Sequence, residues 1–173
     1  MEGFAAPFFV ASALLALAGG AKLARPEPTV GALRSVGVPA NRALAQAFGL
    51  SEVLLGSSAV VIGGAFAAAL VALAYFAFAG FVAVALRKGG AVASCGCFGT
   101  DDSPPTVVHL ALNTLAAAAA VGAALGGVGG IATVIADQPA YGLPFVGFVV
   151  IGTWFAYLAL SVLPTLIPAE AAR

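Results

Sequence analysis

Long apolar runs, separated by short groups of polar residues, make up most of this chain. A helix needs about 20 predominantly apolar residues to cross the hydrocarbon core of a bilayer, and five runs come close to that length. They cover residues 4–23, 43–62, 66–86, 107–125 and 144–166. The pattern therefore predicts an all-α fold, a polytopic transmembrane helix bundle with a four-helix core and a fifth C-terminal span.

The second and third runs lie in one apolar stretch from residue 44 to residue 86, whose only charged residue is Glu52. Gly63-Gly64 is the only plausible break in this stretch. We expect two helices with a tight turn there; the alternative is one long helix preceded by a re-entrant piece. Residues 24–41 hold several Pro and Gly and predict an extramembrane loop, with a short interfacial turn at 33–38. Residues 127–142 predict a second loop along the membrane surface. Asp101, Asp102, Ser103 and the following prolines predict the start of the fourth span.

Composition supports lipid as the solvent. The chain is 62% hydrophobic and 8% charged, with no net charge, which is too apolar for a soluble domain of this length. The absence of net positive charge argues against a nucleic-acid partner. The only charge before the first run is Glu2, whereas a signal peptide carries Lys or Arg there. We therefore expect the first span to be retained.

Basic residues predict the orientation, because cytoplasmic loops are enriched in Lys and Arg. The first and third loops and their edges hold Lys22, Arg25, Arg34, Arg42, Arg87 and Lys88, while the second and fourth loops hold none. We expect a multi-pass protein of the plasma membrane, with the N-terminus outside. The loop after the third span then faces the cytoplasm.

That loop carries both cysteines of the chain, Cys95 and Cys97, separated by Gly96. A disulfide across so tight a ring is strained, and strained disulfides are the reducible and often catalytic ones. Two reduced thiols without a role are one alternative. A Zn or Cu(I) site is another, but a structural site needs about four ligands, so we expect no metal. Redox chemistry is the preferred interpretation.

Four polar or charged residues inside the predicted spans are candidates for chemistry or pairing. His109 and Asn113 share one helix face, and His109 follows the cysteines closely enough to act as a base for a thiol; the alternative is a structural hydrogen bond. Glu52 lies roughly 13–15 Å along its helix, where an unpaired carboxylate is costly. Lys22 is the cation nearest to it in the predicted topology, and it either pairs with Glu52 or extends to the interface.

Together these residues resemble the MauE/DoxX group of redox-associated membrane proteins. The resemblance covers about residues 4–126 and rests on Lys22, Leu23 and Pro26 after the first span, Glu52, the string Cys95 to Gly99, and Asn113. It implies a core domain of residues 1–126, followed by a connecting loop and fifth helix at 127–173. It also implies a role in maturing a disulfide-rich protein, as MauE assists methylamine dehydrogenase, and an extracytoplasmic site, which conflicts with the charge pattern.

We therefore interpret the chain as a thiol–disulfide oxidoreductase in which Cys95, Cys97 and His109 are catalytic. Lys22, Glu52 and Asn113 are intramembrane polar residues. The expected partners are the lipid bilayer and a thioredoxin-like or other thiol protein. No cofactor is required by the motif, and a quinone is the alternative electron acceptor. The rival interpretation is a non-enzymatic scaffold or small-molecule permease subunit built around Glu52 and Lys22.

The charge pattern predicts the outcome of thiol labelling. A membrane-impermeant maleimide applied to intact cells should leave Cys95 and Cys97 unlabelled, because we expect their loop to face the cytoplasm. The same reagent should label both after lysis and reduction. Labelling in intact, reduced cells would reverse the predicted orientation.

Overall fold

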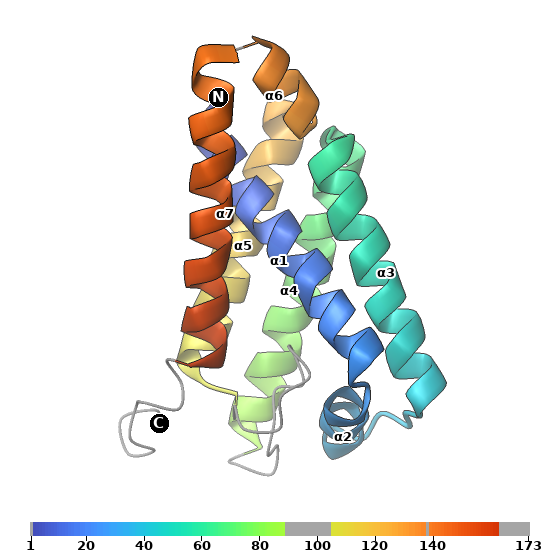
Figure 1. Ribbon diagram of the computed structural model, residues 1–173. Helices are drawn as coiled ribbons and strands as arrows, with labels where there is room; N and C mark the ends of the chain where they lie inside the picture. Colours follow the sequence, from blue (N-terminus) through green and yellow to red (C-terminus); the bar gives the residue numbers. More distant parts are fainter. Residues whose placement is uncertain (1, 89–104, 138, 163–173) are drawn as a thin grey trace.

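The computed structural model describes residues 2–88, 105–137 and 139–162, and within these ranges it is an all-helical bundle (Figure 1). A short 3-10 helix, η1 (Glu2–Phe4), leads into α1. The α-helices are α1 (Ala5–Ala24), α2 (Glu27–Ser35), α3 (Arg42–Val61), α4 (Ala65–Arg87), α5 (Val107–Gly126), α6 (Ile131–Asp137) and α7 (Pro139–Ser161). Helix α1 crosses the bundle obliquely, between α7 and α3.

Among the described residues, five helices have the length and hydropathy to cross a bilayer, which confirms the predicted polytopic helix bundle. They are α1, α3, α4, α5 and the part of α7 from Gly142 to Ser161. The chain turns sharply between α3 and α4, where Gly63 and Gly64 have positive φ angles of 67° and 89°. Glycine adopts such angles without steric cost. The alternative of one long helix in this region is therefore wrong.

The loop predicted between the first two spans is partly wrong, because residues 27–35 form α2. Prolines in this segment favour a loop over a helix. In the structure, however, Pro26 is the N-cap of α2 and Pro28 lies in its first turn, where a missing N–H costs no hydrogen bond. Glu27 in the first turn and Arg34 in the last turn favour the same helix. The second predicted loop is also partly helical, since it contains α6.

Helix α5 begins at Val107, as predicted for the fourth span, but its cap and the start of α7 differ from prediction. Helix α5 is capped by Thr106, whereas the predicted cap, Ser103, lies outside the described residues. Helix α7 begins at Pro139, ahead of the predicted start at 144, and accommodates Pro144 near its beginning. The predicted end of this span at 166 lies outside the described residues.

Small residues bring α1 and α3 into close contact. A Cβ atom built on Gly56 would lie 2.5 Å from the Ser12 carbonyl oxygen, and one on Gly49 would lie 2.8 Å from the Gly19 carbonyl oxygen. No real Cβ fits at such distances, so glycine is required at these contacts. Lipid provides little hydrophobic drive for helix association, and close backbone packing replaces it.

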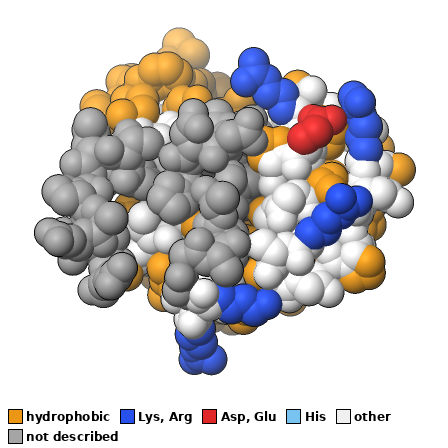
Figure 2. All heavy atoms as spheres, turned by 90° about the horizontal axis from the view of Figure 1, so that it is seen from below, with side chains coloured by type: hydrophobic (Ala, Val, Ile, Leu, Met, Phe, Trp, Pro, Cys, Tyr) orange, Lys and Arg blue, Asp and Glu red, His pale blue; other side chains and the backbone are white. Residues whose placement is uncertain are grey.

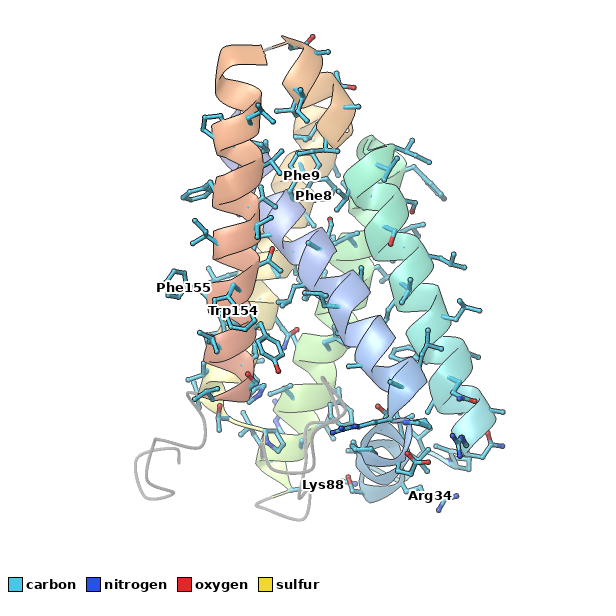
Figure 3. All side chains as sticks on the ribbon, viewed as in Figure 1. Phe8, Phe9, Arg34, Lys88, Trp154 and Phe155 are labelled. Carbon is cyan, nitrogen blue, oxygen red and sulfur yellow. The ribbon has the colours of Figure 1, made fainter. Side chains whose placement is uncertain are left out.

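Helix α7 packs against α1 rather than standing apart from the first four spans. The rings of Phe9 and Phe145 meet edge to face, with centroids 5.8 Å apart, and Val149 is buried in the core. On its outer face, α7 exposes Trp154 and Phe155 (Figure 3). The predicted division of the chain at residue 126 stays a prediction.

The bundle has one basic end. Every exposed Lys and Arg side chain in the described ranges lies there, on or beside the ends of α1, α2, α3 and α4: Arg25, Arg34, Arg42, Arg87 and Lys88. Figure 2 shows these side chains around the face seen from below. The only charged side chain described at the other end of the bundle is that of Asp137. This asymmetry supports the predicted orientation, which remains a prediction.

The α1–α3 contact predicts different costs for two glycine substitutions. Gly56→Ala should lower the free energy of unfolding by about 1–3 kcal/mol, because the new methyl group overpacks the contact with Ser12 and Ala16. Gly80→Ala is the matched control, since nothing lies within 4 Å of a Cβ there, and it should change stability by less than about 1 kcal/mol. Thermal unfolding in detergent measures both. Equal effects would contradict the close packing.

Candidate functional site

Lys22 on α1 and Glu52 on α3 form an ion pair inside the bundle. Lys22 Nζ lies 2.7 Å from Glu52 Oε2, and the side chains are 5% and 4% exposed. The pair lies beside the close approach of Gly19 and Gly49, which brings the two helix backbones together. The structure therefore joins two residues that the sequence left either paired or separate.

Two aromatic rings also lie near the ammonium group. Lys22 Nζ lies 6.0 Å from the ring centroid of Phe48 on α3 and 5.5 Å from that of Phe78 on α4. The electron-rich face of an aromatic ring attracts a cation at such distances. The positive charge is thus held by a carboxylate from α3 and by rings from two helices, which offsets part of its desolvation.

The carboxylate is less completely satisfied. Glu52 Oε1 is buried and has no hydrogen-bond partner among the described residues. A carboxylate has several acceptor sites on its two oxygens, so Lys22 satisfies only one side of the group. Breaking the ion pair would leave Glu52 as an uncompensated charge in a low-dielectric environment.

His109 belongs to the N-terminal cap of α5. Its Nδ1 accepts a hydrogen bond from the backbone N–H of Thr106 at 3.2 Å, and the Thr106 hydroxyl lies 2.9 Å from the same nitrogen. The His109 ring also hydrogen-bonds the backbone of Leu160 on α7. These contacts tie the start of α5 to the end of α7, because one nitrogen accepts while the other carries the proton.

Asn113 lies one turn after His109, on the same face of α5. Its Nδ2 donates a hydrogen bond to the His109 carbonyl oxygen at 2.7 Å, and its side chain is buried. The rest of its amide, one N–H and Oδ1, has no hydrogen-bond partner within the ranges that the structure describes. This group faces a cavity.

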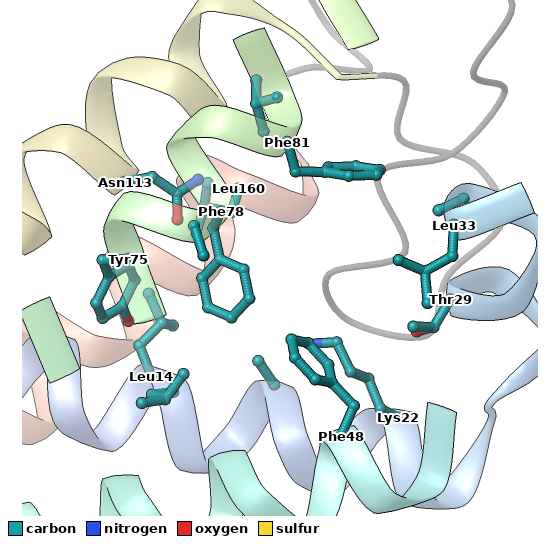
Figure 4. A pocket seen from close by; sticks show the side chains of 15 residues that line it. Leu14, Lys22, Thr29, Leu33, Phe48, Tyr75, Phe78, Phe81, Asn113 and Leu160 are labelled. Atoms are coloured by element: carbon teal, nitrogen blue, oxygen red, sulfur yellow. The ribbon is translucent and has the colours of Figure 1, made fainter. Parts of the chain in front are cut away.

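The cavity has a volume of about 250 Å³ and lies between α1, α2, α3, α4, α5 and α7 (Figure 4). Its lining is mostly apolar, and Lys22 and Asn113 contribute polar groups from different helices. The described residues that line it are Leu14, Leu15, Ala18, Lys22, Thr29, Ala32, Leu33, Phe48, Tyr75, Ala77, Phe78, Phe81, Val82, Asn113 and Leu160. Glu52 and His109 do not line it; each lies behind a residue that does.

Sequence reasoning missed the aromatic members of this site. Tyr75 lines the cavity, and its hydroxyl donates a hydrogen bond to the Ala11 carbonyl oxygen at 2.7 Å. Its ring meets that of Phe78 edge to face, with centroids 5.8 Å apart. The only available signal was the concentration of aromatic residues between 75 and 81.

The predicted redox residues fall in two groups. Cys95 and Cys97 lie outside the described residues, whereas His109 lies within them, at the cap of α5. The predicted approach of His109 to a thiol therefore stays a prediction. Within the described ranges, no group of three or more His, Cys, Asp and Glu residues is arranged to hold a metal ion.

These features define a class: a multi-pass α-helical membrane protein with a buried ion pair at the edge of an apolar cavity. Residues 3–127 match the family of the methylamine utilisation protein MauE. Since the match spans more than half of the chain, the protein belongs to the MauE family, and the predicted resemblance to MauE is confirmed. The DoxX part of that resemblance stays a prediction. No curated protein and no solved structure matches the chain.

The buried ion pair predicts strong coupling in a double-mutant cycle. Lys22→Met and Glu52→Gln should each destabilise the protein, the first by about 3–5 kcal/mol because it leaves a buried carboxylate unpaired. The double variant should lose less than the sum of the two, with a coupling of about 1–3 kcal/mol. Unfolding in detergent is the measurement.

The control cycle uses Glu27→Gln and Arg42→Met. These residues form a looser pair at 3.7 Å with side chains 69% and 68% exposed, and exposed pairs contribute about 1 kcal/mol or less. Additive losses at Lys22 and Glu52, as at this surface pair, would show that the ion pair does not couple the two helices.

Proposed function

We propose that this protein is a membrane thiol–disulfide redox protein that exchanges electrons with a partner thiol protein and assists disulfide formation there. The observation that carries the proposal is the Cys-Gly-Cys string at residues 95–97 in a chain of the MauE family. The family is described by methylamine utilisation, and a maturation role of the MauE type fits a reactive cysteine pair.

The anchors of the cysteine segment support this proposal. The segment begins after α4, where Lys88 Nζ donates a hydrogen bond to the Ser35 carbonyl oxygen at 3.4 Å. It ends at α5, whose first turn is fixed by Thr106 and His109. Both anchors belong to the end of the bundle that also carries α2.

The proposed chemistry is thiol–disulfide exchange. In the oxidising direction, a partner thiolate attacks one sulfur of the Cys95–Cys97 disulfide, the S–S bond breaks, and a mixed disulfide and one free thiolate result. A second partner thiolate then attacks the mixed disulfide and releases the other cysteine. The partner loses two electrons and gains a disulfide, and Cys95 and Cys97 become a dithiol. Reversing each step gives electron flow in the other direction.

His109 enters this proposal as a positioning residue. A general base for a thiol needs a ring nitrogen free to accept its proton, whereas Nδ1 of His109 accepts from the Thr106 N–H and the ring also bonds the Leu160 backbone. Its contacts thus favour holding the start of α5, and with it one end of the cysteine segment.

Placement in the plasma membrane, with the cysteines on the cytoplasmic side, is part of the same proposal.

A small-molecule permease subunit or scaffold is the second candidate. The observation in its favour is the Lys22–Glu52 pair next to a cavity, since intramembrane charges commonly mark substrate pathways. In that case the cysteines are dispensable. Replacing both cysteines separates the two candidates, because only the redox function is lost.

The exchange mechanism predicts a trapped partner. With Cys95→Ala or Cys97→Ala, the remaining thiol cannot resolve a mixed disulfide, so a thioredoxin-like or other thiol protein should stay attached. The adduct should migrate at higher mass on a non-reducing gel, disappear on reduction, and be absent from the Cys95→Ala/Cys97→Ala double variant. If neither single variant traps a protein, the proposal of a thiol partner is wrong.

A further inference from the structure

The wall of the cavity beside Lys22 includes residues on the outside of the bundle. Two of its lining residues, Phe48 on α3 and Ala77 on α4, are exposed, and Phe48 is 41% exposed. The cavity wall therefore continues onto the outside of the bundle between these helices. An entry between these helices would let a ligand that is dissolved in the membrane reach the cavity without crossing water.

The size and walls of the cavity favour a flat ring. A cavity of about 150 Å³ holds a benzene molecule, so a volume of about 250 Å³ has room for a substituted ring or two fused rings. Phe48, Phe78 and Phe81 supply aromatic walls (Figure 4), and aromatic rings pack well in stacked or edge-to-face arrangements.

The polar groups of the cavity suit a ligand with oxygen atoms on the ring. Lys22 lines the cavity while Glu52 does not, so the ion pair presents its positive end. Asn113, on α5, is only 6% exposed and has an amide N–H without a partner among the described residues. Lys22 on α1 and Asn113 on α5 occupy separate walls (Figure 4), as two oxygens at opposite ends of a ring require.

We propose that this cavity binds the head group of a 1,4-quinone, with Asn113 donating a hydrogen bond to one carbonyl oxygen and the Lys22 charge stabilising the other. The positive charge acts on the negative charge that develops as the ring is reduced. A tail longer than the cavity leaves through the opening at Phe48 and Ala77 into lipid.

This inference rests on the proposed redox function for its reaction. The Cys95–Cys97 dithiol supplies two electrons and two protons: two S–H bonds break, one S–S bond forms, and the two quinone carbonyl oxygens become the hydroxyls of a hydroquinone. The quinone thereby regenerates the disulfide that the partner protein consumes. Binding in the cavity itself requires neither cysteine.

The test measures binding of menadione, a two-ring 1,4-quinone, to the purified Cys95→Ser/Cys97→Ser protein in detergent. Removing the thiols prevents both redox chemistry and covalent addition. We expect saturable binding, with a Kd at least tenfold weaker for 2-methylnaphthalene, which has the same rings without the oxygens. Absence of saturable menadione binding overturns the proposal, and equal affinity for both compounds assigns the cavity to apolar molecules such as lipid and overturns it too.

Substitutions on the same background locate the site. Asn113→Leu should weaken menadione binding at least tenfold. Ala77→Phe should do the same by filling the opening, whereas Ala69→Phe, at an exposed position of α4 that does not line the cavity, should leave the Kd unchanged. Because Ala77 and Ala69 are both exposed, the two phenylalanine variants remain informative even where Asn113→Leu unfolds the protein. Equal Kd values for the two phenylalanine variants overturn the assignment to this cavity.

A further arm separates this inference from the proposed function. Menadione should convert the wild-type dithiol to the disulfide, measured by a loss of maleimide labelling that dithiothreitol restores, since a reductant reverses a disulfide but not covalent addition of the quinone. If the cysteine-free protein binds menadione as described while the wild-type thiols neither oxidise nor trap a partner, the cavity assignment stands and the redox function falls.

Discussion

The ion pair between Lys22 and Glu52 is the interaction on which the rest of the site depends. Each charge is expensive within a lipid-facing bundle, and each is tolerable only because the other lies 2.7 Å away. The two residues lie where α1 and α3 touch along their backbones, a contact that Gly19, Gly49 and Gly56 permit. The pair thus fixes which faces of the two helices meet.

The close contact between α1 and α3 also shapes the cavity beside it. Lys22 projects from the α1–α3 contact toward α4, where its ammonium group lies near the rings of Phe48 and Phe78. Side chains of six helices then surround a volume of about 250 Å³ that the described residues leave unfilled. Lys22 therefore serves two purposes, as the partner of Glu52 and as a charged wall of the cavity.

His109 and Asn113 show how one helix end supports this arrangement. His109 joins the start of α5 to Thr106 and to the backbone of Leu160, and Asn113 in turn is oriented by the His109 carbonyl oxygen. A histidine next to a cysteine motif suggests acid–base chemistry when read from sequence alone. Its contacts within the described residues hold the start of α5 and orient the amide that faces the cavity, while its role as a base stays a prediction.

The sequence by itself determined the five spans, the break at Gly63-Gly64 and the polar residues worth following, because a bilayer imposes a length and penalises charge. The sequence did not predict α2, because prolines interrupt most helices but are compatible with the first turn of a helix. Only the tertiary structure decided that Lys22 pairs with Glu52 and that Phe48, Tyr75 and Phe78 share a cavity with Asn113. The reason is physical: lipid is as apolar as the interior of the bundle, so hydrophobicity does not distinguish the face of a spanning helix that packs inward from the face that meets the membrane.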